Sequence, residues 1–339
     1  MHISTQGSSW GDKMAISTRS RTAASTATDS SIISIRDITA ELRPRIKEWK
    51  NSWDLIRHNW TAMMGLVLII TIIIIAILAP VLAPPSGVDA MYIPRDFDLP
   101  KPPFIPGHPL GTGEMGADIY YGVIWGARTT IVISLYVVLT AALVGLVVGA
   151  ISGYYGGVID EVLMRFTDIF LSLPALIMAM AIASILTRNL ENMMFALIIV
   201  WWPSYARLIR GQVLTIREST YVEAAKAIGS KRGRILFRHI VPNSLSPLIV
   251  AITLDLGAVA LVAASLSYIG FGVPSGYAEW GRMVSDGQGW FLAKVPFNGA
   301  YHTPWWVVSF PALMILLFTM GFSLLGDGLR DILDPRSRR

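Results

Sequence analysis

The sequence predicts an all-α membrane protein with six transmembrane helices, and two observations carry that prediction. Hydrophobic residues make up 53% of the 339 residues and charged residues only 15%, a balance typical of chains embedded in a bilayer. The chain also holds six apolar stretches, each long enough to cross about 30 Å of hydrocarbon as a helix. These stretches are residues 61–83, 129–151, 164–187, 193–210, 244–267 and 305–326.

The chain before the first stretch is expected to lie outside the hydrocarbon. Residues 1–44 are predicted to form a disordered cytoplasmic tail, because their Ser/Thr-rich part can bury almost no apolar surface. Nearer the membrane, apolar residues recur at helical spacing among basic ones, namely Trp49, Trp53, Ile56 and Trp60. This pattern predicts a helix lying in the headgroup layer against membrane lipid, and a plain cytoplasmic extension of the first span is the alternative.

The first region, residues 45–125, also contains a proline-rich outer loop that is expected to be extended. The second stretch then carries a small residue at every fourth position, at Ala141, Gly145, Gly149 and Gly153. Such a stripe forms one smooth helix face and predicts close helix packing, without a ligand role.

The remaining stretches complete a permease core, residues 126–327 with five spans, followed by a cytoplasmic tail, 328–339. Pro174 is expected to kink the third span without ending it, because neighbouring helices can satisfy the freed carbonyl. The fourth stretch is short, and Trp201, Trp202 and Pro203 fit an interfacial end as well as a span interior. In the fifth, Asp255 lies roughly 18 Å from the cytoplasmic end, near mid-membrane.

The basic residues predict the orientation of the spans, since Lys and Arg are retained on the cytoplasmic side. Placing the amino terminus inside puts 22 of the 28 Lys and Arg residues in cytoplasmic segments. Both termini are therefore expected in the cytoplasm. The net charge of +5 follows from this topology and requires no nucleic-acid partner.

The sequence offers no catalytic, metal or cofactor site. It contains no cysteine, and its five histidines show no metal-ligand spacing. No phosphate-cradling GxxxxGK[ST] motif occurs either, so ATP hydrolysis is not expected in this chain. A covalent or metal-dependent enzyme is therefore an unfavourable interpretation.

Residues 218–243 interrupt the apolar sequence with basic, helix-prone residues. The order predicts one helix over Glu218–Ile228 that ends at Gly229 in a left-handed conformation, and a second that Ser230 caps and Pro242 ends. A slim helix with apolar anchors and a charged rim is typical of docking into a groove. A basic loop held against anionic lipid is the alternative.

Here a resemblance becomes specific. EAAKAIG followed by ILFRHIVPN resembles the EAA loop of ABC-importer permeases. The stretches GYYGGVIDEVLMRFTDI, ASLSYIGFGV, EWGRM and LLGDGLRDILDPR are similar to the dipeptide/oligopeptide/nickel permease family, C-type subunit. The resemblance runs from about Trp53 to Arg336 and implies the type I importer permease fold in a prokaryotic inner membrane.

The resemblance also implies partners. They would be a homologous second permease completing the path, two ATP-binding subunits, and an extracytoplasmic solute-binding protein. Peptides are the implied substrates, with oligosaccharides or nickel chelates as alternatives. The coupling contact to the ATP-binding subunits would involve Glu223, Ala224, Ala225, Ala227, Gly229, Ile240 and Pro242.

Two departures from the family pattern concern the outer side. Gly113 and Ala117 stand where Asp and Arg are usual, which predicts the loss of an outer charge pair, although Arg128 is kept. The segment 293–304 is longer than usual. Both changes affect the expectation about substrate class.

Asp255 and Arg128 are predicted to lie on the path or at the permease interface. An intramembrane acid is a functional-site hypothesis by default, with a packing role at a helix interface as its equal alternative. A rival of another class is an ion-coupled secondary transporter with Asp255 as proton site, and a third is a membrane scaffold. No internal repeat supports the secondary transporter.

Overall fold

The computed structural model describes residues 57, 59–85, 87 and 89–333. The predicted tail 1–44 and most of the predicted interfacial helix lie outside these residues, as does the end of the carboxyl-terminal tail. Their predictions, and the boundaries of the regions 45–125 and 126–327, stay predictions.

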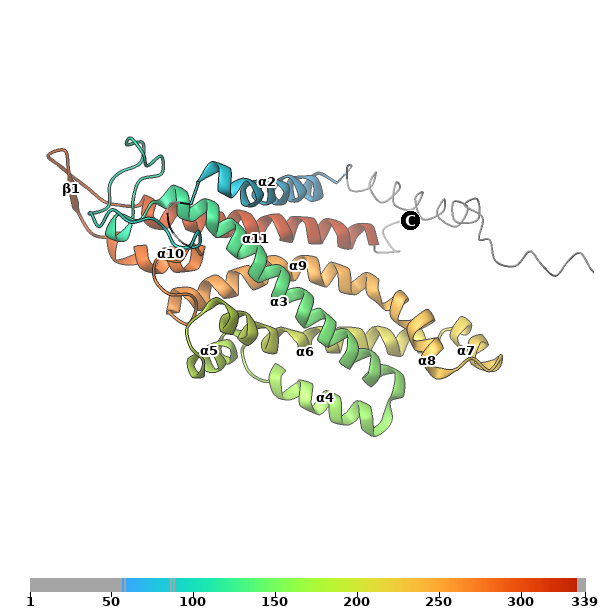
Figure 1. Ribbon diagram of the computed structural model, residues 1–339. Helices are drawn as coiled ribbons and strands as arrows, with labels where there is room; N and C mark the ends of the chain where they lie inside the picture. The colour runs from blue at the N-terminus through green and yellow to red at the C-terminus, as the bar shows by residue number, and fades with distance from the viewer. Residues whose placement is uncertain (1–56, 58, 86, 88, 334–339) are drawn as a thin grey trace, which may run out of the picture. The chain divides into compact units, whose positions relative to one another are not determined.

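Among the described residues, five helices are long and apolar enough to cross a membrane, and one bent pair passes the same test together. The five are α2 (Trp60–Leu82), α3 (Ile119–Tyr155), α6 (Leu190–Arg217), α9 (Val241–Ile269) and α11 (Trp306–Leu333). The pair is α4 (Gly157–Leu171) with α5 (Ala175–Ile185), bent by 87°. These elements correspond to the six predicted stretches, so the all-α expectation is confirmed (Figure 1).

The prediction that Pro174 only kinks its helix is wrong. Helix α4 ends at Leu171, and Pro174 occupies the extended position before α5. Proline disfavours helical geometry in the residue before it and supplies no N–H, so the chain turns here. The Ser172 hydroxyl donates to the carbonyl of Ile169 and closes the end of α4.

Helix α6 is longer than the predicted fourth span. It continues through Pro203 to Arg217, and Trp202 is buried, which settles its place inside a helix. The polar last turns of α6, which contain Arg210 and Arg217, extend the same helix beyond the apolar stretch.

The segment 293–304 forms a small hairpin. Strand β1 (Val295–Phe297) pairs antiparallel with β2 (Ala300–His302), with Val295 opposite His302. Asn298 and Gly299 both have positive φ, the geometry that a two-residue hairpin turn needs. Segment 293–304, which is predicted to be longer than usual, thus contains an ordered hairpin.

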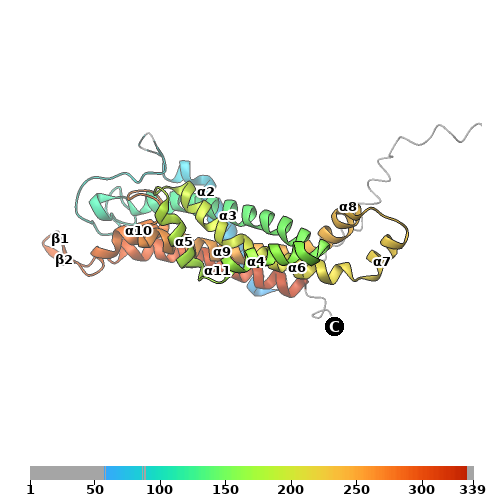
Figure 2. The same ribbon diagram turned by 90° about the horizontal axis from the view of Figure 1, so that it is seen from below.

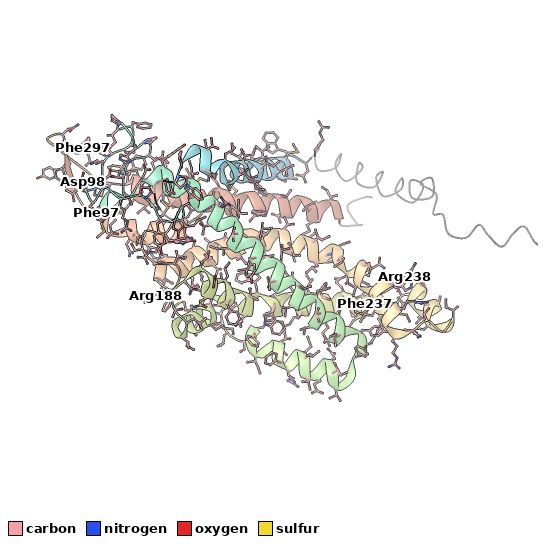
Figure 3. The ribbon with its side chains drawn as sticks, viewed as in Figure 1. Phe97, Asp98, Arg188, Phe237, Arg238 and Phe297 are labelled. Carbon is pink, nitrogen blue, oxygen red and sulfur yellow. The ribbon has the colours of Figure 1, made fainter. Side chains whose placement is uncertain are left out.

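The hairpin and the short helix α7 (Thr220–Ala227) lie at opposite ends of the helices in both views (Figures 1 and 2). Phe297 lies at the first end together with Phe97 and Asp98, whereas Phe237 and Arg238 lie at the second (Figure 3). These ends are called the hairpin end and the α7 end below. Near the hairpin end lie η1 (Glu114–Gly116), α10 (Trp280–Gly287) and η3 (Gln288–Trp290).

Two hydrophobic clusters form the core. One joins α3, α6 and α9 around buried side chains such as Val137, Leu197 and Val259. The other joins α2, α3, α10 and α11 around Trp280 and Phe318. Helix α3 takes part in both clusters, as does α9 through Ala260, so these two helices join the two parts of the core.

The small-residue stripe of α3 faces α6. A methyl group added to Gly145 would lie 2.8 Å from the Trp202 carbonyl oxygen, and one on Gly153 would lie 2.9 Å from Val213 Cβ. Ala141 is fully buried in the same cluster. The two backbones can approach this closely only because these residues lack bulk.

Candidate functional site

The α7 end carries the segment predicted to dock on a partner. Helix α7 ends in a Schellman motif, in which Ser230 N–H donates to Ala225 O at 3.1 Å and Gly229 N–H donates to Lys226 O at 2.9 Å. Gly229 has φ of 79°, so its predicted left-handed conformation is confirmed. The chain then reverses and enters α8 (Arg232–Ile235).

The structure divides the predicted docking residues into two groups. Ala225 and Ile240 are buried in the cluster of α3, α6 and α9, together with Val222 and Ile235. Burying one such aliphatic side chain stabilises by about 1.5–3 kcal/mol, so this side anchors the segment to its own subunit. The exposed residues are Glu223, Ala224, Ala227, Gly229 and Pro242.

Two large apolar side chains on the same segment point away from the core. Ile228 is 83% exposed and Phe237 is 73% exposed. Arg238 follows Phe237, and both lie toward the α7 end, next to the start of α9 (Figure 3). An exposed apolar pair beside basic residues, on a segment clamped from behind, is the arrangement of a helix-in-groove contact.

The predicted ends of the second helix are wrong. Lys231, not Ser230, occupies the N-cap position of α8. Helix α8 continues through a π-helical turn, η2 (Leu236–Ile240), directly into α9, so Pro242 does not end it. Pro242 follows directly after the π turn, whose wider geometry accommodates the proline ring and its missing N–H within the continuous helix.

Asp255 lies half-buried on α9 beside α6. Its carboxyl interacts with the Tyr205 hydroxyl and the Trp201 indole, both on α6. The Tyr205 hydroxyl is buried and makes no hydrogen bond of standard geometry in the described chain. The sequence alone points to Asp255 but not to Tyr205 and Trp201, because these two residues come near it only when α6 packs on α9.

Replacing Asp255 by leucine is expected to lower uptake about tenfold, since the carboxyl group near Tyr205 and Trp201 at the α6–α9 interface is lost. Asp255→Asn keeps an acceptor oxygen and should retain part of the uptake. Solute uptake per amount of membrane-inserted protein measures both variants. Normal uptake by Asp255→Leu would show that the residue serves packing alone.

Arg128 occupies a different environment from Asp255. It is exposed on α3, with its guanidinium carbon 5.7 Å from the centre of the Trp125 ring. Within the described residues, no ion pair links it to Asp255. Arg128 and Asp255 were both predicted to lie on the path or at the permease interface, but they do not contact each other through an ion pair in the described residues.

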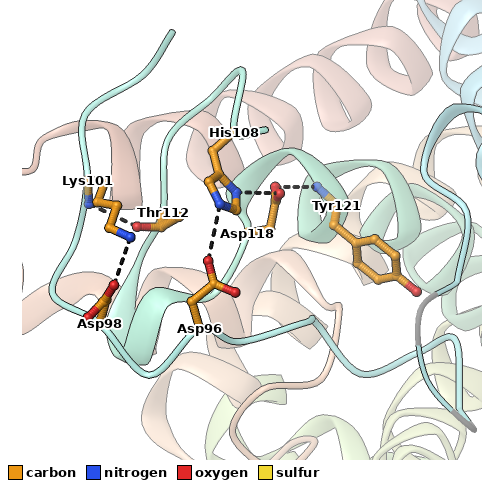
Figure 4. A network of polar contacts seen from close by, with 7 residues as sticks. All are labelled: Asp96, Asp98, Lys101, His108, Thr112, Asp118 and Tyr121. Carbon is orange, nitrogen blue, oxygen red and sulfur yellow. Dashed lines mark hydrogen bonds and ion pairs between the residues drawn. The ribbon is translucent and has the colours of Figure 1, made fainter. Parts of the chain in front are cut away.

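A polar network at the hairpin end was missed by the sequence analysis. Asp118 accepts from the N–H of Tyr121 and caps α3, while its other oxygen lies 2.8 Å from His108 Nδ1 (Figure 4). His108 Nε2 lies 3.3 Å from Asp96, and Lys101 pairs with Asp98 at 2.8 Å. These side chains cross-link the outer loop near Gly113 and Ala117, where the usual charge pair was predicted to be lost.

A second set of contacts fixes α10 at this end. Glu279 is buried and accepts from the N–H groups of Gly281 and Arg282, both at 2.8 Å, which caps the helix. Burial raises the pKa of its carboxyl. Asp286 pairs with Arg282 at 2.5 Å and accepts from Ser275.

Helix α4 is tied to α6 by ion pairs that were also missed. Arg210 binds both oxygens of Asp160 at 2.6 Å, and the Ser152 hydroxyl donates to the same carboxylate. One turn away, Arg207 pairs with Asp168 at 2.5 Å. A sequence signal existed, since charges in otherwise apolar stretches require partners, but the partner's identity depends on the α4–α5 bend.

Comparison with known families places these features in context. The model described as binding-protein-dependent transport system inner membrane component matches residues 145–339, more than half of the chain. The chain belongs to this family. A second model, the N-terminal TM domain of oligopeptide transport permease C, matches residues 47–103 of the permease.

Curated relatives of the permease cover most of its length. The dipeptide transport system permease protein DppC of Alkalihalophilus pseudofirmus is 38% identical over 293 residues, 86% of this chain and 91% of the relative. The oligopeptide transport system permease protein OppC of Bacillus subtilis is 38% identical over 291 residues, 86% of this chain and 90% of the relative. The probable D,D-dipeptide permease DdpC of Escherichia coli is also 38% identical, over 88% of this chain and 96% of the relative.

The predicted resemblance and permease fold are therefore confirmed. The protein is a multi-pass membrane permease of the ABC-importer type and not itself an enzyme. Among solved structures, a chain of the MetNI methionine ABC transporter matches with a TM-score of 0.49 and 17% identity, covering 63% of this chain and 97% of that chain. This last likeness is too low to add to the assignment.

Proposed function

We propose that this permease is one half of the translocation path of an ATP-driven importer for di- or oligopeptides. A homologous permease supplies the other half, two ATP-binding subunits hydrolyse ATP, and an extracytoplasmic solute-binding protein delivers the peptide. The observation that carries the proposal is the α7 segment, clamped by buried Val222, Ala225 and Ile240 while Ile228 and Phe237 stay exposed. A rigid element with free apolar anchors can transmit motion from a partner to the membrane helices.

The α7 end faces the cytoplasm in this proposal. Eight Lys and Arg residues occur between 205 and 243, and cytoplasmic segments retain such residues. The hairpin end then faces outward, where the ordered loops held by Asp118 and Glu279 meet the solute-binding protein. Both termini are on the cytoplasmic side in this orientation.

Peptides are the proposed cargo because the relatives described above are named as dipeptide or oligopeptide permeases. No feature of the described chain favours oligosaccharides or nickel chelates over them. The ion-coupled alternative is less favoured, because Asp255 packs beside Tyr205 and Trp201 in an interface between two helices of one subunit.

The test targets the exposed side of the segment. Ala224→Asp places a charge on the docking face and Phe237→Ala removes an apolar anchor, and each is expected to weaken association with the ATP-binding subunits about 30-fold. Neither should disturb membrane insertion, because both side chains are exposed. Co-purification and peptide-stimulated ATP hydrolysis measure the effect.

Lys231→Gln provides the matched control, since Lys231 is exposed on the rim of the same segment. It should leave association and hydrolysis near normal. If Ala224→Asp and Phe237→Ala also retain coupled hydrolysis, the segment does not couple to an ATPase and the proposed function fails.

A further inference from the structure

A cavity of about 600 Å³ lies at the α7 end. Three cations from three different elements line it: Arg217 at the end of α6, Lys226 on α7 and Arg232 on α8. Tyr154 and Ser230 add hydroxyl groups to the wall. The space is far larger than the roughly 30 Å³ that one water occupies, so a polyatomic group fits.

The positive charges that line the cavity are not balanced by a negative charge among the described residues that line it. No carboxylate lines it, and none of the three cations forms an ion pair with any acid in the described part of the chain. Arg217 donates from Nη1 to the carbonyl oxygens of Gly153 and Tyr154 at 3.2 Å, which orients its guanidinium at the end of α3. Like charges around one cavity repel each other unless an anion lies between them.

We propose that this cavity binds a phosphate group, and specifically the headgroup phosphate of an anionic phospholipid. Guanidinium and ammonium groups with nearby hydroxyls are the donors that phosphate oxygens accept from. Lys226 and Arg232 are exposed, so their donors are free to close on a ligand. The inference does not depend on docking of an ATP-binding subunit.

The position of the cavity favours a lipid over a free phosphate. It lies where the apolar helix α3 ends, beside the adjacent Tyr154 and Tyr155, and tyrosines gather at the membrane–water boundary. Tyr155, which is half-exposed, contributes an aromatic ring on which glycerol carbons can rest. Basic pockets between membrane helices are the sites that anionic headgroups select.

A bound phosphate would join the end of α6 to both halves of the α7–α8 turn. Gly229 makes that turn, and nothing lies within 4 Å of where a side chain on it would begin. The anion therefore acts as a bridge that helps to hold the angle of α7, so anionic lipid adds to the rigidity that the buried clamp already gives the segment.

The test compares two double variants of the full-length chain, purified with its accompanying subunits. Lys226→Gln with Arg232→Gln removes two cavity cations, whereas Lys231→Gln with Arg234→Gln removes the same charge from exposed positions outside the cavity. Each protein is placed in nanodiscs of phosphatidylcholine alone or with phosphatidylglycerol. Native mass spectrometry counts retained lipid, and thermal unfolding reports stabilisation.

The original protein and the control variant should retain phosphatidylglycerol and unfold at a higher temperature with it. The cavity variant should bind it about tenfold more weakly and lose that stabilisation. A third arm adds inorganic phosphate in detergent without anionic lipid. Equal stabilisation by phosphate alone would support the anion site but assign it to a free phosphate and overturn the lipid source.

Two results would overturn the site itself. One is an equal loss of lipid in both double variants, which would mean a diffuse basic surface. The other is no dependence on phosphatidylglycerol or phosphate in any protein, as expected if an acidic side chain of a partner fills the cavity. Because the readouts are binding and unfolding, a failure of ATPase coupling would leave them unchanged.

Discussion

Gly149→Leu is expected to leave little folded permease, whereas Gly211→Leu is expected to be tolerated. Even the first carbon of a side chain at Gly149 would overlap the Ala206 carbonyl oxygen and lie 3.0 Å from the Arg210 nitrogen, both backbone atoms of α6. Backbone cannot rotate aside as a side chain can, so α3 and α6 must separate. Overpacking of this kind costs about 1–3 kcal/mol for small additions and more for a whole side chain.

Gly211 is the matched control because it lies on α6 with nothing within 4 Å of its would-be side chain. In a helix, glycine is about 1 kcal/mol less favourable than alanine, so substitution there should be neutral or stabilising. Size-exclusion profiles and thermal unfolding in detergent compare the two variants. Equal stability of both would show that the α3–α6 contact does not need the small-residue stripe.

Arg210→Met is expected to destabilise the protein by about 1–3 kcal/mol, because it leaves a partly buried carboxylate without its two charged donors. The Asp160 side chain is only 17% exposed, and it would lose both guanidinium hydrogen bonds while remaining charged. The link between α4 and α6 would weaken, since Asp168 and Arg207 form a more exposed pair. The free energy of unfolding in denaturant measures the loss.

A double variant separates the charge effect from lost packing. Asp160→Ala combined with Arg210→Met should be less destabilised than the two single losses added together, which gives the coupling energy of the pair. Glu161→Gln is the control, because its pair with Arg165 is exposed and 3.8 Å long, and should cost less than about 0.5 kcal/mol. Strict additivity at Asp160 and Arg210 would contradict the proposed clamp.

The outer hairpin shows why part of this protein escapes sequence reasoning. The sequence analysis predicts only that segment 293–304 is longer than usual and does not predict its hairpin. The pair Asn298-Gly299, between β-prone residues, is nevertheless a strong hairpin-turn signal. The Asp118–His108–Asp96 network gave no such signal, because its members are separated by a proline-rich loop whose course follows from tertiary contacts.

The sequence by itself indicated the apolar helices long enough to cross a membrane, the family and the left-handed turn at Gly229. These properties are local: hydrocarbon selects long apolar runs, and positive φ selects glycine. Only the tertiary structure decided that the third span breaks at Pro174, that Arg210 clamps Asp160, and that Ala225 and Ile240 face inward while Ile228 and Phe237 stay free. These features depend on which helix packs against α4, α7 and α9. That packing brings together residues far apart in the chain, so local sequence does not specify it.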